Sequence, residues 1–83
     1  MNKIVGQPKR AKENMDWFYN NIGELKRFFA GQWVAVDKGK AVASSNSFRD
    51  LIKKLQKLPK EARELAFVEF VHKKEPYLIF ETA

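Results

Sequence analysis

The sequence predicts a two-layer α+β protein in which two helices cover one face of a small mixed sheet, with the elements in the order α-β-β-α-β-β. Three observations predict this fold. Apolar residues recur at helical spacing in two separate stretches, a glycine-containing turn joins two short alternating segments, and a third alternating segment lies near residue 70. With 83 residues, the chain has room for one domain with a small core.

The first eleven residues are basic and show no helical or strand periodicity. They include a glycine and a proline, and no acidic residue occurs before Glu13. Such a composition is typical of a terminal arm that lacks a core of its own. We therefore expect residues 1–11 to form a flexible basic arm in front of a single α/β domain over residues 12–83.

A helix is predicted from residue 12 by an apolar stripe. Its members are spaced by three or four residues: Met15, Phe18, Ile22, Leu25 and Phe29. Gly31 is a typical C-terminal stop. The main alternative is a break near Asn21, because asparagine and glycine interrupt the middle of the stretch and Asn21 with Glu24 could cap a second helix.

Two short strands are predicted after this helix, over residues 33–36 and 41–44. The residues between them, 37–40, suit a type I turn closed by Gly39 in the left-handed conformation, which is the common three-residue hairpin loop with a bulge.

The second helix is predicted to begin at a capping box formed by Ser47 and Asp50 and to end before Pro59. Its apolar stripe comprises Phe48, Leu51, Ile52, Leu55 and Leu58. Strands are then expected over residues 65–71 and 77–80. A right-handed crossover would make the third strand parallel to the second and place both helices on one face.

This arrangement leaves the second face of the sheet without cover. Both faces are largely apolar, and Trp33, Phe67 and Val71 are expected on the open one. Monomers seldom leave large apolar patches in water. The terminal segments, a second copy of the chain or another protein are therefore expected to cover this face, and self-association is the favoured solution. The candidate interface residues are Trp17, Trp33, Phe67, Val71 and Tyr77.

The residues needed for several kinds of chemistry are missing. The chain has one histidine, His72, and no cysteine, so neither a nucleophilic triad nor a metal site is expected. Its four glycines match neither a P-loop nor a dinucleotide fingerprint. We expect no enzyme, no cofactor and no small-molecule substrate. Without a signal peptide or a membrane span, the cytoplasm is the expected location.

Positive charge is concentrated rather than spread evenly. The net charge is +6, and the stretch from residue 38 to residue 60 has Asp50 as its only acid. Arg49, Lys53 and Lys57 recur every four residues opposite the apolar stripe. They predict either a solvated helix face or a phosphate-binding ridge. The candidate nucleic-acid-binding residues are Lys9, Arg10, Lys12, Lys38, Lys40, Arg49, Lys53, Lys54, Lys57 and Lys60.

Three segments resemble domain-of-unknown-function family 5678, a family of small prokaryotic proteins common in archaea. They cover residues 25–36, residues 38–42 and residues 67–71. The resemblance extends from about Trp17 to Phe80. It implies a stand-alone α/β protein with a helix, a hairpin, a second helix and a further strand, and it supplies no catalytic residues.

The favoured hypothesis is a small non-enzymatic interaction module, either dimeric or a subunit of a larger complex. The alternative is a nucleic-acid-associated accessory protein, for example one bound to ribosomal RNA, that uses residues 1–12 and 38–60 to contact phosphates. Salt separates the two hypotheses, because binding to nucleic acid weakens steeply with salt and apolar assembly does not.

Overall fold

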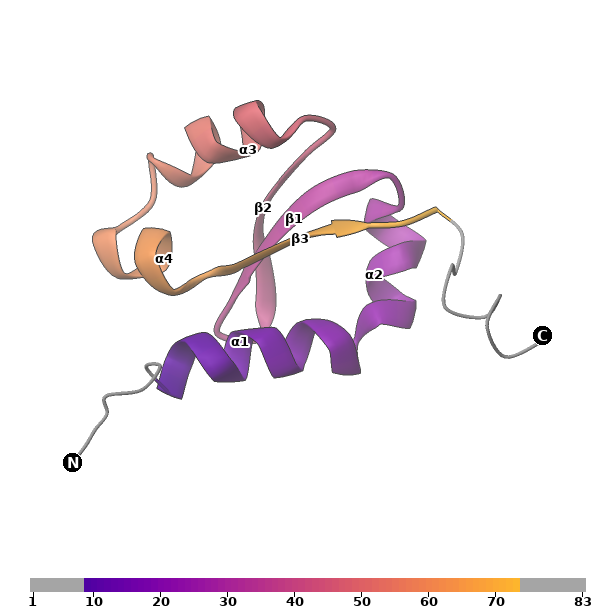
Figure 1. Ribbon diagram of the computed structural model, residues 1–83, viewed down its shortest axis with the longest axis horizontal. Helices are drawn as coiled ribbons and strands as arrows, with labels where there is room; N and C mark the ends of the chain where they lie inside the picture. The colour runs from indigo at the N-terminus through magenta and orange to yellow at the C-terminus, as the bar shows by residue number, and fades with distance from the viewer. Residues whose placement is uncertain (1–8, 74–83) are drawn as a thin grey trace.

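The computed structural model describes residues 9–73 and contains helices on both sides of a three-stranded sheet (Figure 1). The α+β class and the order of the first five predicted elements are confirmed. The elements are α1 (Lys9–Asn20), α2 (Ile22–Phe29), β1 (Gln32–Asp37), β2 (Lys40–Ser45), α3 (Phe48–Leu55), α4 (Lys60–Leu65) and β3 (Phe67–Val71). The strand expected over residues 77–80 lies outside the described residues.

Strand β1 lies in the centre of the sheet, which has the order β2-β1-β3. Both neighbours pair with it antiparallel, so the three described strands form an antiparallel sheet rather than the expected mixed one. β2 and β3 do run in the same direction, as predicted, but β1 separates them. The prediction of a parallel pair assumed that β3 would lie next to β2.

Helices cover both faces of this sheet, whereas the sequence analysis placed the two predicted helices on one face. Figure 1 shows α1 and α2 on one side and α3 on the other. Val34 and Val36 pack with Phe18 of α1 and Leu25 of α2, whereas Ala35 packs with residues of α3. The physical reason is the alternation along β1, which sends apolar side chains to both faces and requires an apolar cover on each.

The alternative of a break near Asn21 is confirmed. α1 ends at Asn20 and α2 begins at Ile22, and the stripe of apolar residues continues across the break. The side chain of Asn21 does not cap α2. Its Nδ2 donates instead to the Trp17 carbonyl oxygen at 2.8 Å, which satisfies an acceptor at the end of α1.

The hairpin turn is a two-residue loop, not the predicted three-residue one. Asp37 pairs with Lys40, and both residues between them have positive φ, +54° at Lys38 and +75° at Gly39. Two positive φ values are the requirement of a type I′ turn. Gly39 does adopt the predicted left-handed conformation, and the bulge lies further along, where Val42 is the extra residue of β2.

Ser47 caps α3 as predicted, since its Oγ accepts a hydrogen bond of 3.0 Å from the Asp50 amide. The helix ends at Leu55, and hydrogen-bonded turns continue it to Leu58. At the other end of the chain, residues 9–11 belong to α1 rather than to the expected arm. The rest of that arm, residues 1–8, lies outside the described residues.

Candidate functional site

The exposed side of α3 carries the basic residues that the spacing predicted. Arg49, Lys53 and Lys57 are all exposed, while Leu51 and Leu55 are buried under them. Lys57 lies in the turn that follows the helix. These three cations, here called the basic flank, therefore remain open to solvent. Lys38, Lys40 and Lys60 are exposed as well.

The cations of α3 differ in direction around the helix axis. Lys54, on one side of the apolar stripe, donates from its Nζ to the carbonyl oxygen of Ser44 on the edge strand β2, at 2.6 Å. In an α-helix, Arg49 lies about 140° from Lys54 around the axis, and Lys53 lies between them on the side that faces away from the stripe. Arg49, which follows Phe48 directly, therefore lies on the opposite side of the stripe from Lys54, and the Lys54 ammonium has a partner within the fold.

Aromatic residues gather beside this flank. The Trp33 ring lies 5.0 Å from that of Phe48 and 5.5 Å from that of Phe70, and the Phe70 ring lies 5.1 Å from that of His72, measured between centroids. We call these four residues the aromatic patch. Phe48 is 48% exposed and His72 is exposed, while Trp33 and Phe70 are half-buried. α3 packs mainly on β2 and β1, so its cover does not extend over Phe70.

Three of the predicted cations near the N-terminus have anionic partners. Lys12 Nζ lies 2.9 Å from an Asp16 oxygen, and Lys9 Nζ lies 4.0 Å from a Glu13 oxygen. Both pairs are exposed and span one helical turn of α1. The Arg10 guanidinium binds the Asp37 carboxylate through Nε and Nη2, and its Nη1 lies 3.2 Å from Glu61 Oε1. The structure thus places Arg10 in a cluster that holds the fold together.

Asn14 completes this cluster at the hairpin. Its Nδ2 donates to Asp37 Oδ1 and to the carbonyl oxygen of Leu65, both at 2.8 Å, and its Oδ1 accepts from the Lys38 amide at 3.0 Å. Asn14 and Asp37 are only 2% and 4% exposed. The network joins α1, the hairpin and the end of α4, and its hydrogen bond helps to hold Lys38 in the left-handed conformation.

The charge of Asp37 is stabilised by these neighbours. The hydrogen bond from Arg10 is the largest influence and lowers the pKa of the carboxyl below its ordinary value of 3.8, against the opposing effect of burial. Asn14 and the charges of Arg10 and Lys38 act in the same direction as the hydrogen bond. The pairing in turn raises the pKa of Arg10. An ion pair with an internal structural partner explains this cluster without any catalytic role.

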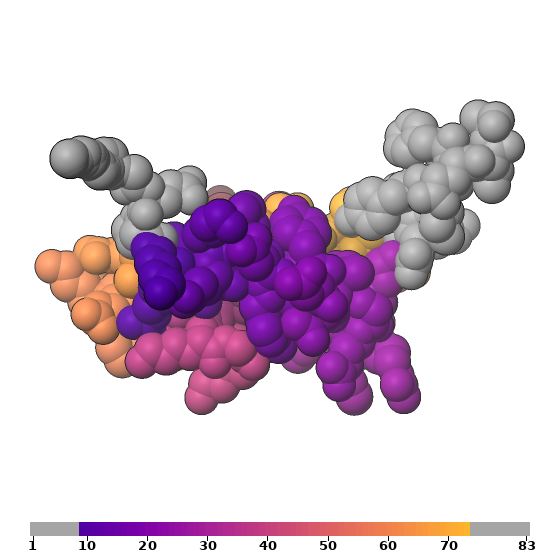
Figure 2. Space-filling model, turned by 90° about the horizontal axis from the view of Figure 1, so that it is seen from below, coloured from indigo at the N-terminus to yellow at the C-terminus, as the bar shows by residue number. Residues whose placement is uncertain are grey.

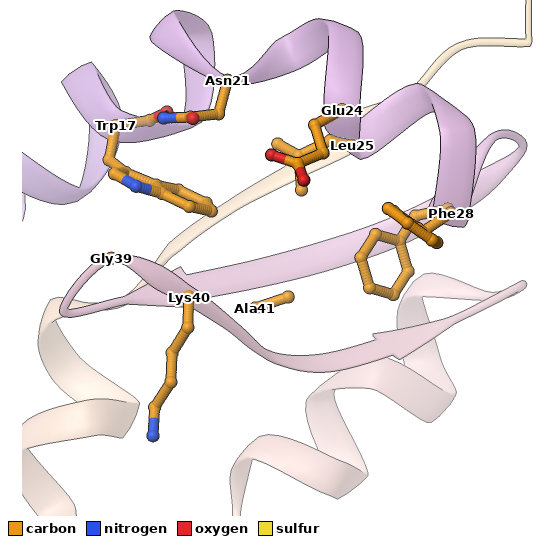
Figure 3. Close-up of a pocket in the computed structure, with 9 residues that line it drawn as sticks. Trp17, Asn21, Glu24, Leu25, Phe28, Gly39, Lys40 and Ala41 are labelled. Carbon is orange, nitrogen blue, oxygen red and sulfur yellow. The ribbon is translucent and has the colours of Figure 1, made fainter.

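A groove of about 240 Å³ opens on the opposite side of the molecule, between the two N-terminal helices and the start of β2. Figure 2 views the molecule from the side on which α1 lies. This groove is here called the hairpin groove. It is lined by Trp17, Asn21, Glu24, Leu25, Phe28, Phe29, Gly39, Lys40 and Ala41. In Figure 3 the Trp17 and Phe28 rings stand at its two ends, the Glu24 carboxylate lies between them, and the Lys40 side chain extends away from it.

The predicted interface residues separate into different environments. Val71 is fully buried, and Phe67 packs against Phe18 with ring centroids 5.4 Å apart, so both belong to the core under α1 and α2. The prediction that they share an open face with Trp33 is wrong, because Trp33 pairs with Phe70 and points to the opposite face. Trp17 lines the hairpin groove, and Tyr77 lies outside the described residues.

Sequence reasoning missed the aromatic patch and the hairpin groove. The sequence analysis places Phe48 in the apolar stripe of the second helix, Phe70 within the strand over residues 65–71, and His72 at the end of that strand. The available signal was the aromatic side chain directly before Arg49, together with the two rings of Phe70 and His72 spaced two residues apart at the end of the predicted strand.

The described part of the chain contains neither a metal-binding cluster nor a membrane-spanning helix. Residues 9–73 hold no group of three or more histidine, cysteine or acidic side chains able to bind a metal ion. None of the helices in that range is long and apolar enough to cross a membrane.

The fold and these surfaces define a small α+β protein with helices on both faces of an antiparallel sheet. A family model matches residues 24–74, more than half of the chain. The chain therefore belongs to DUF5678, a family of unknown function. No curated protein and no solved structure matches the chain.

Proposed function

We propose that this protein is a non-enzymatic interaction module that binds single-stranded nucleic acid. The observation that carries the proposal is the position of the basic flank next to the aromatic patch. The cations of Arg49, Lys53 and Lys57 would contact phosphates, and the exposed rings beside them would stack on unpaired bases.

Charge supports the first half of this proposal. The three cations are exposed and form no ion pair with another described residue, so they remain available to phosphate groups. Neutralising phosphates with lysine and arginine releases condensed counterions and provides affinity without base specificity. The net charge of +6 adds long-range attraction for a polyanion.

The aromatic patch supports the second half. Proteins that bind single strands combine a basic surface with rings on which bases stack, and each stacked base contributes about 1–3 kcal/mol. Bases in a duplex are already stacked on one another and cannot reach such rings. The patch therefore favours a single-stranded ligand over a duplex.

The expectation of a dimer through an open sheet face loses its main support. Both faces have covers, and Phe67 and Val71 contribute to the core of one of them. The exposed surface on the α3 side is basic and aromatic. Such a surface fits a nucleic acid better than a second copy of the chain, because the second copy would carry the same positive charge.

The proposal is tested by measuring the fluorescence anisotropy of labelled oligouridylate and of an RNA duplex over a range of salt concentrations. We expect tighter binding of the single strand and a steep salt dependence. The variant R49Q/K53Q/K57Q should bind weakly and show a log–log salt slope smaller by about 2, since each lost phosphate contact removes about 0.7 from the slope. Phe48→Leu should weaken binding about tenfold and leave the slope unchanged.

A charge-matched control is available on the other side of the molecule. The variant K9Q/K12Q/R27Q also removes three positive charges, all from exposed residues of α1 and α2. It should retain most of the affinity of the wild type. Equal losses in the two triple variants would mean that only the net charge matters, and equal affinity for duplex and single strand would contradict the stacking role of the patch.

A further inference from the structure

The hairpin groove has the composition of a site for a cationic side chain. Its floor is apolar, formed by Leu25, Phe29 and Ala41, and aromatic rings stand at its ends. Phe28 is 65% exposed, which is unusual for a side chain of its size. The groove lies on the side of α1 and α2, remote from the basic flank of α3, so a ligand here would be additional to the nucleic acid proposed above.

Its polar groups favour a positive ligand. The Glu24 carboxylate lies between the two rings, and within residues 9–73 no ion pair or hydrogen bond engages it. Lys40 is the one cation among the lining residues, and its side chain is directed out of the groove in Figure 3. The Arg27 guanidinium carbon lies 6.0 Å from the centroid of the Phe28 ring, so Trp17 is the ring that is left for a ligand. The chain has a net charge of +6, yet the charged group between the rings of this groove is the Glu24 carboxylate.

We propose that the hairpin groove binds an arginine side chain presented by a partner protein. A guanidinium group stacks on aromatic faces through cation–π attraction and binds a carboxylate through two parallel hydrogen bonds. Trp17 offers the ring, and Glu24 offers the carboxylate. The methylene stem of the arginine would lie along the apolar floor.

Gly39 lies next to the Trp17 end of the groove. A Cβ atom at this position would lie 3.7 Å from Trp17 Nε1, an ordinary van der Waals distance, so the indole lies close to the backbone of the hairpin turn. Contact with the turn on one side limits the positions open to the ring before a ligand binds, and such preorganisation reduces the entropy lost on binding.

Arginine is a better match than lysine for geometric reasons. Its group is planar and can lie flat against the indole while its fork of donors reaches the carboxylate, whereas an ammonium group is a compact, strongly hydrated charge.

The test uses the full chain and nuclear magnetic resonance. The protein has two tryptophans, one in the groove and one in the aromatic patch on the opposite face, so the two indole N–H signals report on separate surfaces. The probe is N-acetylarginine amide, and N-acetylcitrulline amide is its neutral isostere. Because a single side chain in an open groove binds in the millimolar range, titration extends to about 50 mM.

We expect the Trp17 indole signal to shift saturably with the arginine probe and the Trp33 signal to remain in place. The citrulline probe should bind at least tenfold more weakly, and a blocked lysine several-fold more weakly. Glu24→Gln should reduce arginine affinity at least tenfold, whereas Glu64→Gln, which removes an exposed carboxylate of α4, should not change it.

Four results would overturn the proposal. These are equal binding of the citrulline probe, equal binding of the blocked lysine, unchanged affinity in Glu24→Gln, and no shift of the Trp17 signal at the highest probe concentration. A Trp17 signal that shifts with protein concentration alone would assign the groove to a second copy of the chain instead. Glu24→Gln replaces an exposed side chain by its isostere, so folding is expected to be unaffected.

Discussion

The two sides of the central strand β1 are covered to different extents. On the side of α1 and α2, Val34 and Val36 are fully buried, Phe18 is 1% exposed, and the Asp37 cluster ties the helix to the hairpin. On the side of α3, Leu51 is fully buried but the aromatic residues near β3 stay partly exposed. The side of α1 and α2, here called the closed side, thus holds the more deeply buried core, whereas aromatic side chains on the side of α3, here called the open side, stay partly exposed.

The largest expected effect comes from truncating the buried ring on the closed side. Phe18→Ala should destabilise the protein by about 3–5 kcal/mol, because it leaves a large cavity between α1 and the sheet. Phe48→Ala, on the open side, should cost only about 1 kcal/mol because that ring is already 48% exposed. Urea unfolding measures both values.

A chain of this length has a total stability of about 4–12 kcal/mol, so the loss expected for Phe18→Ala is comparable with the whole stability of the fold. Phe18→Leu, with an expected loss of about 1–2 kcal/mol, is then the substitute, compared with Phe48→Leu. Equal losses at positions 18 and 48 would contradict the difference between the two sides.

The next largest effect is expected at the buried ion pair. Asp37→Ala should cost about 3 kcal/mol, because it removes the acceptor that the Arg10 guanidinium and the Asn14 amide share and leaves them only Glu61 and the Leu65 carbonyl, respectively. Asp16→Ala removes the exposed partner of Lys12 and should cost less than about 0.5 kcal/mol. Thermal and urea unfolding of the two variants would show whether the cluster contributes to stability as its burial indicates.

A smaller effect is expected at the hairpin turn, which contacts the closed side through Asn14 and Trp17. Gly39→Val should cost about 1–2 kcal/mol, since a β-branched residue is poorly tolerated at a φ of +75°. Lys38→Asn should instead stabilise the turn by up to about 1 kcal/mol, because asparagine adopts positive φ more readily than lysine. If both variants had wild-type stability, the turn would have another conformation in solution.

Protonation should produce the smallest effect at Asp37, since it removes the charge of this side chain and leaves its atoms in place. The pKa of Asp37 is lowered on folding, so its contribution to stability is complete above about pH 4 and is lost as the pH falls through the folded-state pKa. The melting temperature of the wild type should therefore fall below about pH 4. That of Asp37→Asn should fall less over the same range, and parallel curves would exclude Asp37 as the titrating group.

The sequence predicted those features that depend on neighbouring residues. The apolar stripes located the helices, Ser47 and Asp50 located the start of α3, and the four-residue spacing of Arg49 and Lys53 located the basic flank. Each of these features is determined within one or two helical turns. The possible break at Asn21 was identified for the same reason.

Features that join distant residues could not be predicted in this way. Periodicity shows that a helix has an apolar face but does not show which face of a sheet it will cover. The type I′ turn depends on the left-handed conformation of Lys38, whose amide is held by Asn14, 24 residues earlier. The aromatic patch brings together Phe48 and Phe70 through Trp33, and the groove needs α2 and β2 side by side.

The hydrogen bond from Lys54 to the Ser44 carbonyl has a consequence for the protein at high concentration. β2 is an outer strand, and an outer strand with free backbone groups is a template for pairing with another chain. The lysine occupies one of these groups and places a charge beside it, while the bulge at Val42 interrupts the regular spacing of the others. The contact between Lys54 and Ser44 forms only when α3 is docked on the sheet. A change that loosens α3 should therefore also expose the backbone of β2 and promote aggregation along this strand.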